Sequence, residues 1–128
     1  FTGLLDHRYA PETVAALDAL AVPSTEKEAF GMVAAEAAAA GTLPVVARQS
    51  AHAEVAATLE AAIGRPGALS FESGPGATRR LAERLGALLD EPAEIREKLG
   101  AAARTHVVNE WTWERTAERL LEAANAAR

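Results

Sequence analysis

Residues 24–47 read STEKEAFGMVAAEAAAAGTLPVVA, and this stretch decides the fold class. Its first part is polar and predicts a loop. The apolar run 30–40 predicts a helix that ends at Gly41, because glycine favours the backbone conformation found after helix C-termini. Residues 44–47 predict a strand, with proline in a first position where its missing N–H is tolerated. A loop, a helix and a strand in this order are typical of a parallel sheet.

The flanking sequence repeats this alternation of short strands and helices. Strands are predicted over residues 1–4, 21–23 and 68–71, and helices over 10–20, 52 or 53 to 62, 77–89, 92–108 and 113–127. We therefore predict an α/β fold: a partial Rossmann-like parallel sheet of three or four strands flanked by helices. Residues 1–128 are expected to form a single, truncated domain whose C-terminal part, 92–128, is helical.

Composition narrows the class of protein. The chain has 128 residues, 49% hydrophobic and 24% charged, which is typical of a globular protein. Its net charge of −5 disfavours nucleic-acid binding, and the absence of cysteine excludes disulfides and zinc–cysteine sites. Because the sequence has neither a membrane span nor a signal peptide, we expect a soluble, cytoplasmic protein.

Glu36 is the one charged residue between Ala29 and Val46. Burying an unpaired carboxylate costs on the order of several kcal/mol, so we do not expect one in a helix this apolar unless the carboxylate has a partner or is not buried. Three explanations stay open: Glu36 meets a ligand in a cleft, it faces solvent, or it pairs with an arginine such as Arg48.

The helix that carries Glu36 is expected to begin at the carboxyl edge of the sheet, where open α/β folds bind ligands. Free backbone amides at its start attract an anionic or hydroxyl-rich ligand, and Gly31 allows close approach. Glu28 lies in the loop just before. Two carboxylates on one elongated ligand suit the vicinal hydroxyls of a sugar or ribose.

These residues occur in a recognisable order. Glu28 and Glu36 are separated by seven residues that include Phe30-Gly31, and they are followed by Ala40-Gly41 and Pro44-Val45-Val46. This pattern resembles the C-terminal nucleotide-sugar domain of retaining GT-B glycosyltransferases, especially bacterial members of family 4. The resemblance extends over nearly the whole chain. It continues in Phe1-Thr2-Gly3, Pro23-Ser24, Glu54-Val55, the stretch 99–104 and Trp113-Glu114-Arg115.

The resemblance implies the C-terminal half of a GT-B fold and gives each residue a role. Glu28 would contact the hydroxyls of the transferred hexose as the catalytic residue, and Glu36 would hold the ribose hydroxyls. The remaining donor-binding residues would meet the sugar and the diphosphate; they are Ala29, Phe30, Gly31, Met32 and Val33. The donor would be a UDP- or GDP-sugar, with no metal and no other cofactor. In this family the leaving phosphate helps to remove the acceptor proton, so no protein nucleophile is needed.

Some features depart from the family pattern or fall outside it. Thr42-Leu43 places an extra residue before Pro44, and Ser50-Ala51 replaces a glycine pair found in many relatives. The phosphate-binding Arg and Lys, and a domain that binds the acceptor (a sugar, a lipid or a small molecule), would precede Phe1. The apolar face around Leu120 and Leu121 would then be uncovered, so we expect the chain to be able to self-associate.

Other residues suggest competing interpretations. His7, His52 and His106 are expected to be solvated rather than metal ligands, although His52 could border the ligand cleft. Trp113 is expected to anchor the last helix in the core. A nucleotide-sugar epimerase of GT-B architecture, or a non-catalytic interaction module, remain alternatives to a glycosyltransferase.

The missing upstream groups lead to a first prediction. The 128 residues alone should bind UDP or GDP weakly in a calorimetric titration and should transfer no sugar, because acceptor and phosphate contacts would lie elsewhere. Measurable sugar transfer by the purified chain would contradict this expectation.

Overall fold

A computed structural model describes residues 6–24 and 26–127, and its centre is a parallel sheet. Strands β1 (Ala19–Val22), β2 (Leu43–Ala47) and β3 (Ser70–Phe71) lie in the order β1-β2-β3. Ala19 is paired with Leu43, and Val46 with Ser70. All five residues of β2 are buried, as expected for a central strand covered on both faces. The predicted α/β class with a parallel sheet is confirmed; the predicted strand 1–4 lies outside the described residues.

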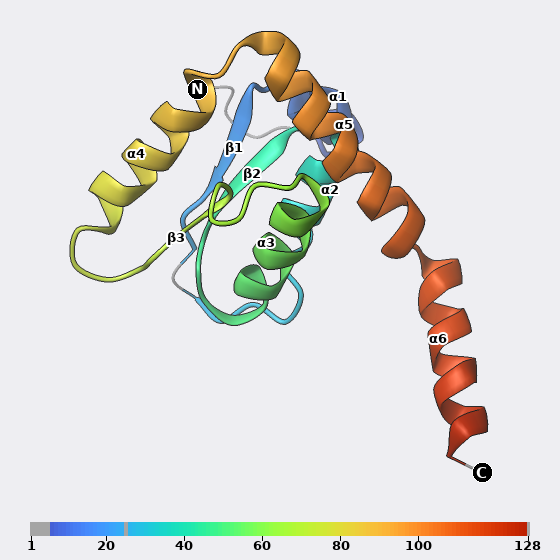
Figure 1. Ribbon diagram of the computed structural model, residues 1–128. Coiled ribbons are helices and arrows are strands. Elements are labelled where there is room, and N and C mark those ends of the chain that lie inside the picture. The colour runs from blue at the N-terminus through green and yellow to red at the C-terminus, as the bar shows by residue number, and fades with distance from the viewer. Residues whose placement is uncertain (1–5, 25, 128) are drawn as a thin grey trace.

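Helices cover both faces of this sheet. A short 3-10 helix and six α-helices are described: η1 (His7–Tyr9), α1 (Ala10–Ala15), α2 (Met32–Ala40), α3 (Ser50–Ala62), α4 (Ala77–Leu89), α5 (Ala93–Glu110) and α6 (Trp113–Ala126). Figure 1 shows α2 and α3 together on one side of the strands, α4 on the other, and α5 crossing one end. None of the described helices has the length and hydrophobicity needed to cross a membrane.

The first helix is shorter than the sequence predicts. Helix α1 ends at Ala15 instead of residue 20, and the following strand starts earlier, at Ala19. The reason is a long-range contact: the buried Thr42 hydroxyl donates to the Val14 carbonyl over 2.6 Å. The extra residue before Pro44 thus has a structural use, because Thr42 satisfies a carbonyl at the end of α1.

Helix α2 ends as the sequence predicts. Gly41 follows it in the left-handed conformation, with φ of 88°. The Gly41 amide donates to the Ala38 carbonyl over 3.0 Å and the Thr42 amide to the Ala37 carbonyl over 2.9 Å. This is the pattern of a Schellman motif, which satisfies carbonyls that a helix end would otherwise leave unpaired.

Small residues let α5 approach the C-terminal end of α2 closely. A Cβ placed on the buried Gly100 would lie 2.1 Å from the Gly41 carbonyl oxygen. One turn further on, the Arg104 guanidinium donates to the Ala39 carbonyl. A cation at this end also interacts favourably with the α2 dipole. The junction therefore joins the C-terminal helices to the sheet domain.

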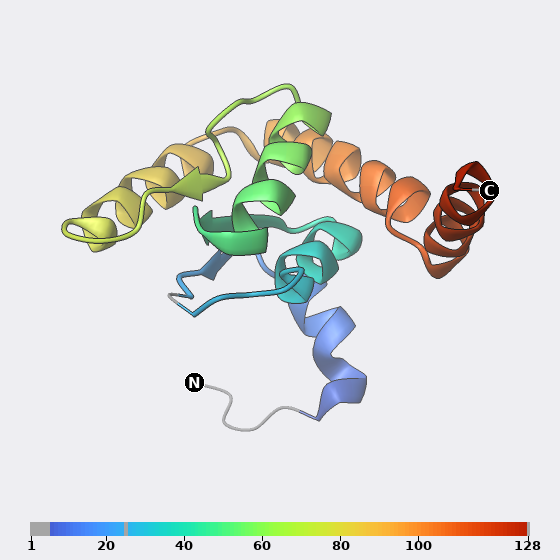
Figure 2. The same cartoon turned by 90° about the horizontal axis from the view of Figure 1, so that it is seen from below.

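Helix α6 extends away from the other elements in both views (Figures 1 and 2). The Thr112 side chain caps it by accepting from the Arg115 amide, but Trp113 is 85% exposed, so its prediction as a core anchor is wrong. Trp111 packs against the core in its place. Leu120 and Leu121 are each 66% exposed, which confirms an uncovered apolar face; self-association stays a prediction.

Two glycines in helices provide a matched test of the α2–α5 junction. Gly100→Ala should lower the free energy of unfolding by about 1–3 kcal/mol, because the new methyl group forces two backbones apart. Gly86→Ala in α4 should raise it by about 0.5–1 kcal/mol, since no atom of the described residues lies within 4 Å of a Cβ there. Urea denaturation measures both values, and equal effects would show that the junction is not tightly packed.

Candidate functional site

The loop between β1 and α2 carries Glu28, and the segment after β2 holds it in place. The Gln49 side-chain amide donates to the Ser24 carbonyl over 2.6 Å and approaches the Glu26 carbonyl at 3.4 Å. The Ala51 amide donates to the Glu28 carbonyl over 3.5 Å. The backbone around Glu28 is therefore tied to the start of α3, while its side chain is exposed.

Gly31 lies directly against His52. Its φ is 83°, a conformation that residues with a Cβ rarely adopt, and a Cβ on it would lie 2.6 Å from His52 Cδ2. His52 is only 1% exposed, so the prediction that it is solvated is wrong. Its Nδ1 is buried without a partner among the described residues. The buried His52 ring thus packs against the end of the loop at Gly31, and only glycine at position 31 leaves room for this ring.

The other two histidines differ from each other. His7 is exposed, as predicted. His106 is half-buried, with its ring at 5.5 Å from that of Trp111 in an edge arrangement, and its Nε2 has no partner among the described residues. In the part of the chain that the structure describes, no three His, Asp or Glu side chains are grouped so as to hold a metal ion.

The N-terminal end of α2 faces solvent. Met32 and Val33 are exposed, and Gly31 offers no side-chain cap. The amides of Met32 and Val33 find no acceptor within residues 6–24 and 26–127. Phe30, exposed on one side, packs edge-on against Trp111 with ring centroids 5.7 Å apart. The predicted stretch from Ala29 to Val33 therefore presents two free amide donors at the surface.

Glu36 is exposed on α2 and borders a cavity of about 530 Å³ between η1, α1 and α2. Other polar side chains lining it are His7, Glu12 and Arg104. Arg48 does not pair with Glu36, since its guanidinium contacts Ser70 and Glu72. Glu36 has no ion-pair partner in the described part of the chain, so its carboxylate is available at the cavity.

Asp6 caps the short helix η1, whose residue His7 borders this cavity. Its carboxylate accepts from the Arg8 guanidinium at 2.9 and 3.1 Å and from the Arg8 amide at 2.9 Å, which caps the short helix. The Arg8 side chain first, and the amide second, hold the pKa of Asp6 below its ordinary value. Asp6 therefore stays charged at neutral pH beside His7.

The structure brings some of the predicted residues together and separates others. Glu36 and the free amides share one helix, and Glu28 lies in the loop that leads to it. Glu28 does not line the Glu36 cavity, and neither do the residues from Ala29 to Val33. The contributions of His7, Glu12 and Arg104 to the cavity were not predicted, because each reaches it from a different helix. Gln49 and its hold on the loop were missed for the same reason.

The contact between Gly31 and His52 can be tested against a second left-handed glycine. Gly41→Ala should lower the free energy of unfolding by about 1–2 kcal/mol, because a residue with a Cβ rarely adopts a φ of 88°. Within residues 6–24 and 26–127, no atom lies within 4 Å of a Cβ at this position, so a steric clash adds nothing to this cost. Gly31→Ala should cost at least about 1 kcal/mol more, since His52 must move as well. Thermal and chemical unfolding measure the difference, and a double-mutant cycle with His52→Ala isolates the contact. Equal costs at both positions would refute it.

Comparison with known proteins agrees with this architecture. The family described as "Glycosyl transferases group 1" matches residues 1–106. A Corynebacterium glutamicum protein named GDP-mannose-dependent monoacylated alpha-(1-6)-phosphatidylinositol monomannoside mannosyltransferase is 37% identical over 126 residues, which are 94% of this chain and 30% of that protein. The D-inositol 3-phosphate glycosyltransferase of Nocardia farcinica is 41% identical over 112 residues, 88% of this chain and 22% of that protein. No solved structure matches the chain significantly.

The chain thus spans less than a third of the length of either relative. The family match covers the β1–α2 loop, both glutamates, the three strands and most of α5. The predicted C-terminal half of a GT-B fold fits the three-stranded parallel sheet with helices on both faces. On these grounds, the chain belongs to the group 1 glycosyl transferases.

Proposed function

We propose that this chain is the donor-binding domain of a retaining hexosyltransferase of family 4, which moves a hexose from a nucleoside diphosphate sugar to an acceptor hydroxyl. The observation that carries this proposal is the exposed, unpaired carboxylate of Glu36 at the edge of a cavity of about 530 Å³, in a helix otherwise made of apolar residues. A carboxylate in this position can accept hydrogen bonds from both hydroxyls of a ribose.

The remaining contacts follow from the start of α2. The free amides of Met32 and Val33 offer hydrogen bonds and a partial positive charge to the diphosphate. Glu28, in the loop held by Gln49, extends the site toward the hexose. Because the two glutamates do not share a cavity, we assign them to opposite ends of one elongated donor.

In the proposed reaction, the bond between the hexose anomeric carbon and the phosphate oxygen breaks. The acceptor oxygen forms the new bond on the same face of the sugar, and the acceptor proton passes to the leaving phosphate. Glu28 orients the hexose, and the amides at α2 stabilise the charge on the diphosphate. The nucleotide sugar is itself the activated reactant, so the proposal needs no metal or further cofactor.

GDP-mannose is the donor to test first. Both UDP- and GDP-sugars fit the contacts described, but the name of the Corynebacterium relative specifies GDP-mannose. We propose an acceptor that is a sugar, a lipid or a small molecule bound largely outside these residues, and a cytoplasmic reaction in a bacterial cell.

Removing the Glu36 charge tests the nucleotide contact. Glu36→Gln in the full-length protein should weaken GDP binding about tenfold or more, because a charged hydrogen-bond acceptor contributes roughly 1.5–3 kcal/mol. Glu97→Gln removes the same charge from an exposed position of α5 outside the cavity and should leave binding unchanged. Isothermal titration calorimetry gives both dissociation constants. If Glu36→Gln binds GDP as tightly as the unaltered protein, Glu36 does not hold the ribose.

A second variant separates the two glutamates. Glu28→Gln should weaken binding of GDP-mannose and slow its transfer, but it should leave the affinity for GDP unchanged, because the nucleotide has no hexose. The titrations with GDP and GDP-mannose, run side by side, measure this difference. Equal loss of both affinities would place Glu28 at the nucleotide rather than at the sugar.

A further inference from the structure

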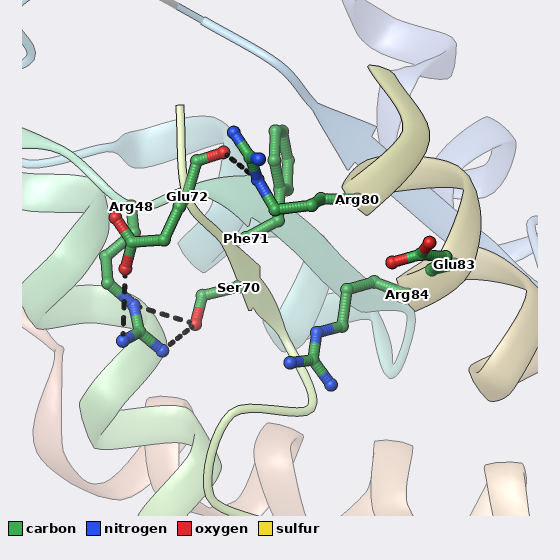
Figure 3. A pocket seen from close by; sticks show the side chains of 7 residues that line it. All are labelled: Arg48, Ser70, Phe71, Glu72, Arg80, Glu83 and Arg84. Atoms are coloured by element: carbon green, nitrogen blue, oxygen red, sulfur yellow. Dashed lines mark hydrogen bonds and ion pairs between the residues drawn. The ribbon is translucent and has the colours of Figure 1, made fainter. Parts of the chain in front are cut away.

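A second cavity, of about 310 Å³, lies where β3 meets α4 and shares no residue with the Glu36 cavity (Figure 3). Three arginines and two glutamates line it together with Ser70 and Phe71; the charged residues are Arg48, Glu72, Arg80, Glu83 and Arg84. The lining is therefore net positive, although the chain as a whole carries a charge of −5.

A buried carboxylate fixes one side of this cavity. Glu60 on α3 is only 6% exposed and accepts from the Gly67 amide at 2.8 Å, the Leu69 amide at 3.0 Å and the Ser70 hydroxyl at 2.8 Å. Because the Ser70 proton is directed to Glu60, its oxygen is free to accept from Arg48, which donates through Nη2 at 2.8 Å and Nε at 3.3 Å. The Arg48 guanidinium is thus oriented from the protein interior outward.

Two arginines of α4 form the other side. Arg80 donates to the carbonyls of Glu72 at 2.8 Å and Ser73 at 3.1 Å, which fixes the chain that leaves β3. Arg84, one turn further along α4, has neither an acceptor nor a carboxylate partner in the described residues. Figure 3 shows the guanidinium groups of Arg48 and Arg84 on either side of Ser70.

The two glutamates compete only weakly for these arginines. Glu83 pairs with Arg79, on the same helix, at 3.6 Å. Glu72 contacts Arg48 at 3.4 Å, but its side chain is largely exposed, and exposed ion pairs contribute little. An incoming anion can therefore reach both Arg48 and Arg84 without breaking a buried interaction.

We propose that this cavity binds the phosphate group of a small phosphorylated molecule. Guanidinium groups donate paired, charge-assisted hydrogen bonds to phosphate oxygens, and Arg48 and Arg84 can do so from two sides. The volume suits a small ligand, and the acidic chain disfavours a nucleic acid. Since no residue is shared with the Glu36 cavity, the site is separate from the proposed donor site.

Binding of inorganic phosphate and of glycerol 3-phosphate to the 128-residue chain tests this proposal. Calorimetry should detect saturable binding of both probes, and Arg84→Gln should raise the dissociation constant about tenfold or more. Arg119→Gln removes an equal charge from an exposed position of α6, outside the cavity, and should change the dissociation constant by less than about twofold. Glu72→Gln should tighten binding, because it removes the carboxylate that competes for Arg48.

Three results would overturn the proposal: no saturable binding of either probe, an Arg84→Gln variant that binds like the unaltered chain, or equal losses in the Arg84 and Arg119 variants. Circular dichroism confirms that each variant is folded. Because GDP contains phosphates, the Glu36→Gln variant is titrated with inorganic phosphate as well. Unchanged phosphate affinity in that variant separates this site from the proposed donor site.

Discussion

Helix α2 is held at both ends by contacts that only glycine permits. These contacts fix the position of the candidate site residues on the helix. At its N-terminal end Gly31 adopts a left-handed conformation against the buried His52 ring. At its C-terminal end Gly41 turns the chain into β2, and Gly100 of α5 touches its carbonyl. The alanines between them allow close packing on both sides. With the helix fixed in this way, the position of Glu36 is fixed as well.

The two candidate sites use different physical means to attract an anion. At α2, backbone amides and the helix dipole supply partial positive charge beside a carboxylate that can bind hydroxyls. At β3 and α4, full charges on Arg48 and Arg84 are oriented by a buried carboxylate through Ser70. The first arrangement suits a ligand with both diphosphate and hydroxyls, and the second suits a phosphate alone.

The sequence predicted the features that local patterns encode. The bounds of α4 were predicted residue for residue, and the Gly41 end of α2 is confirmed. It also predicted that Glu36 is exceptional in an apolar helix. Features that depend on distant residues were missed or wrong: Thr42 shortens α1, His52 is buried beneath Gly31, and Trp113 is exposed because α6 has no neighbour within the described chain to cover it. The arginine cavity was missed because its residues come from three separate segments.

The most direct test of the account is a nuclear magnetic resonance titration of the isotope-labelled chain with GDP, which detects even weak binding residue by residue. The account predicts that the largest shifts fall on the amides of Met32, Val33 and Glu36. Shifts confined to other surfaces, with these three amides unmoved at saturating GDP, would contradict the assignment of α2 as the nucleotide-binding helix.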